Sequence, residues 1–264
     1  MLHKSIVSER GTVHYWISRS AKTDKTIVFS HGLTANHTMF EKQVGFFRED
    51  FNIITWDVPL HGLSRPYKDF SYKNCAQELC TILDAELIDK VILVGMSMGG
   101  YPSQMFAYLY PQRTEGLVAL DTSPFGLEYY SKADIWWLNR VALMAKWFPD
   151  KVLRRSMAKS VSKTQYSYDL MMSMLESLTK AEIIKQMDIA YQGFIQENQN
   201  VSFSFPVIIL VGKYDTTGKV ASYCKEWAKN TQCPLIIINH AAHLANCDNP
   251  EQTNLEILKF IQKL

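Results

Sequence analysis

A short segment with chemically useful residues lies at positions 95–99, where the chain reads Gly-Met-Ser-Met-Gly. This G-x-S-x-G pattern directly follows the apolar run 90–94, and apolar residues then recur at helical spacing from Tyr101 to Tyr110. A sharp turn from strand to helix lifts the central serine above the sheet, and flanking glycines avoid collisions that a Cβ would cause. We therefore predict that Ser97 is a nucleophile at such a turn.

A serine hydroxyl is a weak nucleophile at neutral pH, so it needs a histidine base whose tautomer is set by a carboxylate. The apolar run 206–212 reads as a buried strand that delivers Asp215 to a turn containing Gly218. Asp121 ends an earlier apolar run and is the second candidate for the acid. The chain order of nucleophile, acid and base favours Asp215.

Two histidines compete for the role of base. The apolar run 234–238 ends close to His240, whereas His243 lies deeper in the following loop, ahead of a final helix predicted from Pro250 to Leu264. This position favours His243. The spacing of the two histidines also suits a metal pair, but no third ligand lies nearby in the sequence, so we expect no metal site.

Along the rest of the chain, predicted strands alternate with predicted helices, as a parallel sheet requires. Residues 4–18 predict a hairpin that turns at Arg10 and Gly11, a helix with an apolar stripe follows around residues 75–83, and 116–120 predicts another strand. From Thr122 to Phe205 the alternation stops, because the periodicity there is helical throughout.

This helical stretch is rich in large, adaptable apolar side chains. We expect most of these side chains to pack into a small core within the helical stretch. As a group they also indicate an apolar lining for an acyl pocket. They are Trp136, Trp137, Trp147, Met144, Met157, Met171, Met172, Met174 and Met187.

Several segments together resemble the α/β-hydrolase family, and the likeness covers nearly the whole chain. His31-Gly32-Leu33 is similar to the family's H-G-x loop, and residues 57–64 resemble its D-x-x-G-H-G-x-S stretch, with Leu60 in place of the first glycine. Residues 95–100 resemble the nucleophile turn of small esterases, and residues 243–251 resemble the segment that holds the family's catalytic histidine.

The resemblance implies a mostly parallel eight-stranded sheet with helices on both faces. Residues 1–121 and 206–264 would form this core, and residues 122–205 would form an inserted helical cap. The same alignment favours His243 over His240 as the base.

An oxyanion hole is expected beside the nucleophile. The implied catalytic residues are Ser97, Asp215 and His243, and the backbone N–H groups of Leu33 and Met98 would stabilise the oxyanion that forms during acyl transfer.

Other polar residues near these motifs have structural explanations. Asp57, at the end of a strand, is expected to cap the loop through His61 and Gly62, and His31 and His61 are expected to hydrogen-bond locally. The chain contains neither a G-x-G-x-x-G nor a G-x-x-x-x-G-K-[ST] pattern, so we expect no nucleotide cofactor and no other cofactor.

Composition limits the partners. The 264 residues include 28 Lys and Arg against 26 Asp and Glu, a net charge of +2 that argues against nucleic acid. No leader-like apolar segment and no run of about 18 apolar residues occurs, so the sequence predicts a cytoplasmic protein without a membrane span. The five cysteines form no C-x-x-C pair and are expected to be reduced.

These observations predict a serine hydrolase that cleaves a small to medium, largely apolar carboxylic ester, its small-molecule acyl substrate, through an acyl-enzyme. Lactonase, thioesterase, aminopeptidase and C–C bond hydrolase or lyase activities share the same catalytic residues and remain alternatives. A receptor that keeps the fold and uses the pocket only for binding is the alternative from another class.

Overall fold

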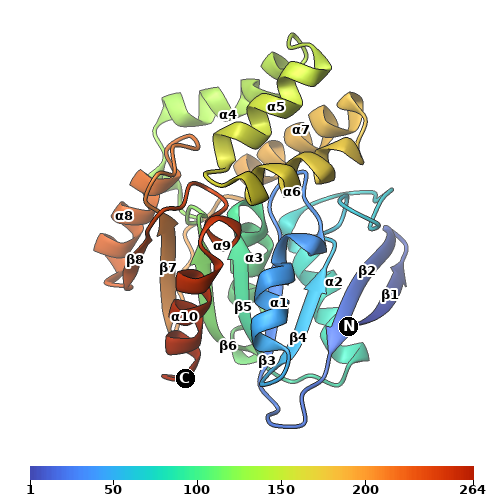
Figure 1. Cartoon of the computed structure of the whole chain (residues 1–264), viewed down its shortest axis with the longest axis vertical. Coiled ribbons are helices and arrows are strands. Elements are labelled where there is room, and N and C mark those ends of the chain that lie inside the picture. The colour runs from blue at the N-terminus through green and yellow to red at the C-terminus, as the bar shows by residue number, and fades with distance from the viewer.

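The computed structural model describes all 264 residues, and its centre is one eight-stranded sheet (Figure 1). The strand order is β1-β2-β4-β3-β5-β6-β7-β8; the pairs β1/β2 and β2/β4 are antiparallel, and all later pairs are parallel. The strands are β1 (Leu2–Ser8), β2 (Gly11–Ser18), β3 (Thr26–Ser30), β4 (Asn52–Trp56), β5 (Val91–Met96), β6 (Thr114–Leu120), β7 (Val207–Gly212) and β8 (Leu235–Ile238).

Helices cover both faces of this sheet, as predicted. In the core they are α1 (Glu41–Phe47), α2 (Tyr72–Ala85), α3 (Gly100–Leu109), α8 (Val220–Thr231), α9 (Ala245–Asp248) and α10 (Pro250–Ile261). Between β6 and β7 the chain forms only helices: α4 (Lys132–Ala145), α5 (Asp150–Val161), α6 (Gln165–Glu176) and α7 (Lys180–Glu197), with a single short 3₁₀ turn ahead of them (Leu127–Tyr129). Figure 1 shows α4 to α7 together at one end of the molecule, beyond the sheet.

Alternation along the strands divides the core into two layers. Val28, Leu93 and Leu117 point to the face covered by α2, α3 and α8, while the neighbouring residues Phe29 and Val94 point to the face covered by α1 and α10. All five side chains are buried, as expected for central parallel strands with helices on both faces. The predicted hairpin, the parallel sheet and the fold class are therefore confirmed.

Side-chain caps fix where the helices beyond the sheet begin. Ser131 and Asp134 form a reciprocal capping box at the start of α4, and Thr179 and Glu182 form another at α7. Each box satisfies backbone N–H groups that have no partner within the helix. No helix of the protein combines the length and the apolar character that a bilayer crossing demands.

Leu60 stands where the D-x-x-G-H-G-x-S motif has its first glycine, and its backbone conformation reflects this. Leu60 has φ +74°, in the left-handed region that glycine adopts at little cost and that leucine rarely occupies. Its carbonyl accepts a hydrogen bond of 2.9 Å from the Gln186 side chain on α7, and its side chain is buried. The hydrogen bond from α7 and the burial of the leucine side chain thus hold the loop in the conformation that a glycine would favour.

Candidate active site

The nucleophile turn forms where β5 passes into α3. Ser97 has φ +51° and opens a 3₁₀ turn, Ser97–Gly99, directly after the last residue of β5. A Cβ built on Gly95 would lie 2.6 Å from the Cα of Gly100, and one on Gly99 would collide with the carbonyl oxygen of Ser30. The glycines at these two positions are required because the backbones of β3, β5 and α3 approach too closely for any side chain.

A continuous hydrogen-bond chain joins the three residues that the sequence singled out. The Oγ of Ser97 lies 2.8 Å from Nε2 of His243, and Nδ1 of His243 lies 2.9 Å from Oδ2 of Asp215. The other oxygen of Asp215 accepts the N–H of Thr217 at 2.8 Å. With its proton on Nδ1, His243 donates to the carboxylate and presents a free Nε2 lone pair to the serine hydroxyl.

Neither competing residue is hydrogen-bonded to Ser97 or His243, although Asp121 lies beside them. His240 has an exposed side chain in the turn after β8, with φ +56°, and has no hydrogen bond to the other candidates. Asp121 is fully buried and accepts the N–H groups of Gly212 at 2.7 Å and Ala245 at 3.3 Å. Burial, together with the neighbouring Asp215 charge, raises the pKa of Asp121 well above its usual value. Asp121 therefore ties strand ends together beside the site.

Asp121, Asp215 and His243 also form the one cluster whose ligand atoms lie close enough together for a metal ion, within 4.8 Å of one another. Each carboxylate already accepts two hydrogen bonds, and Nδ1 of His243 is bonded to Asp215. A metal ion would have to displace these bonds, so the donor set suits the hydrogen-bond chain better than a metal.

His31 positions the loop that carries Leu33. Its Nδ1–H donates to the Gly32 carbonyl at 2.8 Å, and its Nε2 accepts the N–H of Val58 at 3.0 Å. Burial lowers the pKa of His31 to about 4, so the ring is neutral and this pair of bonds defines one tautomer. The Leu33 N–H donates no hydrogen bond within the protein, and Leu33 lines a cavity together with Ser97 and Met98.

Asp57 has the structural role that its position suggests. Its Oδ1 accepts from the backbone and the ring of His37, both at 2.8 Å, and its Oδ2 accepts the N–H of Leu63 at 2.6 Å. Burial alone would raise its pKa, but these donors and the nearby His31 hold the pKa below its ordinary value. The carboxylate therefore stabilises the loop 57–63, as predicted.

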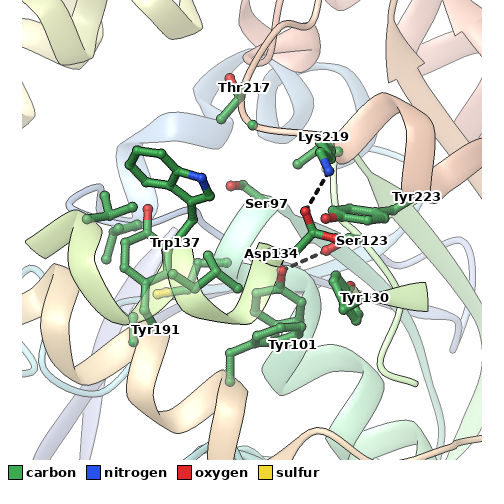
Figure 2. A pocket seen from close by; sticks show the side chains of 18 of the residues that line it. Ser97, Tyr101, Ser123, Tyr130, Asp134, Trp137, Tyr191, Thr217, Lys219 and Tyr223 are labelled. Carbon is green, nitrogen blue, oxygen red and sulfur yellow. Dashed lines mark hydrogen bonds and ion pairs between the residues drawn. The ribbon is translucent and has the colours of Figure 1, made fainter. Parts of the chain in front are cut away.

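Two cavities meet at Ser97 and His243. The larger has a volume of about 460 Å³ and is lined by aromatic rings, including Tyr101, Trp137 and Tyr191 (Figure 2). The smaller has a volume of about 170 Å³. Ser97, His243, Leu33, Thr217 and Tyr191 line both cavities, and the smaller one is otherwise lined largely by Met39, Met96, Met157, Met171 and Met187.

The larger cavity has a polar wall that the sequence did not indicate. Tyr101 and Ser123 hydroxyls lie 2.8 Å apart, and Asp134 on α4 pairs with Lys219 at 2.6 Å, as the dashed lines in Figure 2 show. Tyr101 lies in the first turn of α3, four residues after Ser97, and its position directly after the G-x-S-x-G pattern was a usable signal. The other lining residues come from separate segments and had no local signal.

A buried carboxylate joins the His243 loop to the helices beyond the sheet. Asp248 accepts the N–H groups of Lys163 at 2.9 Å, Thr164 at 2.8 Å and Ala242 at 2.9 Å. The Leu244 N–H also donates to the Val161 carbonyl at 2.9 Å. The connection between α5 and α6 thus supports both sides of the candidate base.

The fold and the site together define the class of this protein. The family model described as alpha/beta hydrolase fold matches residues 25–250, so the chain belongs to the α/β-hydrolase family, and it is a hydrolase.

Individual relatives show which hydrolases it is similar to. The chain is 26% identical to 3-oxoadipate enol-lactonase 1 of Acinetobacter baylyi, over 89% of this chain and 85% of the relative. It is 24% identical to the sn-1-specific diacylglycerol lipase ABHD11 of Mus musculus, over 89% and 80%. In structure it is similar to a thermophilic esterase from Thermogutta terrifontis, with a TM-score of 0.80, 20% identity and coverage of 100% and 99%.

We expect the two buried histidines beside the site to make the protein sensitive to acid. Burial lowers the pKa of His31 to about 4 and that of His61 to about 3, from an ordinary value of 6.5. The unfolded chain therefore takes up these protons first, so stability falls progressively as the pH drops from about 6.5 toward the folded-state pKa values of about 4 and 3. Between about pH 7.5 and pH 5, each histidine should lower the free energy of unfolding by roughly 2 kcal/mol.

Urea unfolding at the two pH values measures this effect. The matched variant is His61→Asn, whose amide can still donate to the Pro59 carbonyl that His61 contacts at 3.1 Å but does not titrate. Over this pH range the variant should lose roughly 2 kcal/mol less of its free energy of unfolding than the parent. An equal loss of stability in the parent and in His61→Asn would contradict the assignment.

Proposed function

We propose that this protein is a serine hydrolase that cleaves a carboxylic ester through an acyl-enzyme. The observation that carries the proposal is the hydrogen-bond chain from Ser97 through His243 to Asp215, located where the two cavities meet. Relatives with esterase, lipase and lactonase names support the ester bond as the target.

The first half of the reaction forms the acyl-enzyme. Nε2 of His243 accepts the hydroxyl proton as Ser97 Oγ attacks the acyl carbon, and Asp215 stabilises the imidazolium that results. The carbonyl oxygen becomes an oxyanion, which the N–H groups of Leu33 and Met98 stabilise. His243 then returns the proton to the leaving alcohol as the C–O bond of the ester breaks.

The second half releases the acid. His243 removes a proton from a water molecule as the water oxygen attacks the acyl carbon. The bond between the acyl carbon and Ser97 Oγ then breaks, and His243 returns the proton to Ser97. Apart from the substrate and this water, the groups that act in both halves belong to the chain.

The cavities suggest the size of the substrate. Residues 122–205 act as a cap, because Trp137 and Tyr191 from this segment cover the larger cavity and Met157 and Met171 cover the smaller one. If each non-hydrogen atom takes about 30 Å³, as a water does, the smaller cavity holds on the order of five such atoms and the larger about fifteen. We propose a substrate with one short and one longer apolar arm on either side of the ester bond.

A lactone is the second candidate substrate. The chain aligns with 3-oxoadipate enol-lactonase 1 over most of both sequences, and ring opening of a lactone is ester cleavage in which the alcohol and the acid remain on one molecule. The same hydrogen-bond chain serves both reactions, so only substrate comparison distinguishes them.

Ser97 should be the site of covalent labelling. A fluorophosphonate probe should modify the protein once, since His243 activates only this hydroxyl, and digestion followed by mass spectrometry should place the adduct on Ser97. Ser97→Ala should remain unlabelled. An adduct on another residue, or equal labelling of the variant, would show that the nucleophile is wrong.

The acid and the base can be tested in matched pairs. His243→Ala and Asp215→Asn should each lower kcat for an ester by about 10⁴-fold or more, because the base is lost in one and its tautomer is reversed in the other. His240→Ala and Asp121→Asn should lower kcat far less, since neither residue bonds to His243. Circular dichroism checks that all four variants fold. If His240→Ala lowered kcat more than His243→Ala, His240 would be the base, and if Asp121→Asn lowered it more than Asp215→Asn, Asp121 would be the acid.

Chain length should affect the rate differently on the two sides of the ester. In p-nitrophenyl esters and in acetate esters of longer alcohols, kcat/KM should rise a few-fold per methylene, from about 0.8 kcal/mol each, until the relevant cavity is full. One of the two series should reach its optimum within a few carbons and the other only with a longer chain.

Variants identify the cavity that limits each series. Met171→Ala should lengthen the shorter optimum, whereas Met172→Ala, on the same helix but outside both cavities, should leave it unchanged. Lactones, thioesters and aminoacyl amides complete the panel. A flat profile in both series, or turnover confined to charged substrates, would contradict an apolar site.

A further inference from the structure

The outer face of the segment formed by α4, its turn and α5 carries large apolar side chains that are exposed to solvent. Trp136, Leu143 and Trp147 are 49%, 54% and 86% exposed. With Arg140 they recur at intervals of four, three and four residues, the spacing of one helical face. Because turns at Lys146 and Trp147 continue the end of α4, this stripe runs into the connection to α5.

The stripe is part of a wider patch, which we call the hairpin face. It is more extensive than the isolated apolar residues that surfaces ordinarily show, and such patches mark interaction sites. The sequence analysis expected its tryptophans to be core or pocket lining, and for Trp136 and Trp147 the structure shows neither. The exposed apolar members of the hairpin face are Trp136, Leu143, Met144, Trp147, Phe148 and Val152.

The segment that carries this face is strongly positive. Residues 131–163 contain eight Lys and Arg but only two Asp, a net charge of +6, whereas the whole chain carries +2. Both aspartates are paired, Asp134 with Lys219 and Asp150 with Arg154. The exposed Lys132, Lys146, Lys151, Arg155 and Lys159 form no ion pair within the protein.

We propose that the hairpin face docks on the surface of an anionic lipid membrane. Tryptophan prefers the boundary between headgroups and acyl chains, and helices that lie in this boundary combine such apolar residues with Lys and Arg. The cations would be attracted to the lipid phosphates and carboxylates, while the rest of the chain, with a net charge of −4, would be repelled and so orient the molecule.

The opposite sides of the same two helices line the cavities. Trp137 and Val141 of α4 contact the larger cavity, and Met157 and Val161 of α5 contact the smaller one. Trp136 and Trp137 pack edge to face with ring centres 5.3 Å apart, so adjacent residues link the hairpin face to the cavity wall. If the proposed function holds, docking through this face would place the ester site directly above a membrane that contains apolar esters.

Vesicle binding tests the proposal without using catalysis. The protein is centrifuged with vesicles of two parts phosphatidylcholine to one part phosphatidylserine, and with vesicles of phosphatidylcholine alone. We expect binding to the anionic vesicles, weakening as salt is added, and a blue shift of tryptophan emission on binding. Little binding to the neutral vesicles is expected.

Two double variants alter the hairpin face alone. Lys151→Glu with Arg155→Glu should weaken binding to anionic vesicles on the order of 10²-fold, since each cation near such a surface contributes roughly fivefold. Trp147→Ala with Phe148→Ala should weaken it about tenfold and reduce the blue shift. None of these four residues lines the cavities that contain Ser97, so hydrolysis of a water-soluble ester without vesicles should be unchanged.

Matched controls carry the same changes elsewhere. Lys225→Glu with Lys263→Glu makes an equal change of charge, and Leu87→Ala removes an apolar side chain that is 93% exposed; both should bind vesicles like the parent. Equal binding by parent and hairpin variants, or equal loss in the controls, would overturn the proposal. So would a dimer in sedimentation analysis that Trp147→Ala dissociates, because the hairpin face would then bind a second copy.

Discussion

The site depends on a close approach of three backbones around Ser97. The left-handed conformation of this serine persists because β5 is held between β3 and β6, and α3 begins immediately afterwards with no room for side chains at Gly95 and Gly99. A residue in this region of φ and ψ is strained, and only well-packed surroundings keep it there. The hydroxyl consequently has a fixed position, around which the base and the loop of Leu33 are arranged.

The candidate base His243 is held both by residues close to it in the sequence and by distant segments. Asp248 and the Val161 carbonyl bond to the residues on either side of His243, and Asp121 bonds to Ala245 just after it. Hydrogen bonds to three separate acceptors thus hold this loop from several directions. The helices beyond the sheet therefore do more than cover the cavities, because one of their connections helps to position the histidine.

The same helices use apolar residues on two sides. Methionines and aromatic rings face inward around the cavities, while Trp136 and Trp147 face outward with a surplus of cations. A helical period shows which residues share a face, but not what that face contacts. This is why the richness of residues 122–205 in Trp and Met was interpreted from the sequence only as core or pocket lining, and why the outward set was missed.

The sequence by itself predicted the elements and the candidate nucleophile. Strands such as Thr26–Ser30 and the turn at Ser97 depend on neighbouring residues, whose periodicity and glycines are visible in the chain. Chain order, loop position and likeness to a family extended this to Asp215 and His243. Only the tertiary structure showed the contacts themselves, in which Nε2 of His243 lies against the Ser97 hydroxyl and Asp121 accepts two backbone N–H groups. It also formed the cavities. Each of these features joins segments far apart in sequence, and their distances depend on how the whole chain packs.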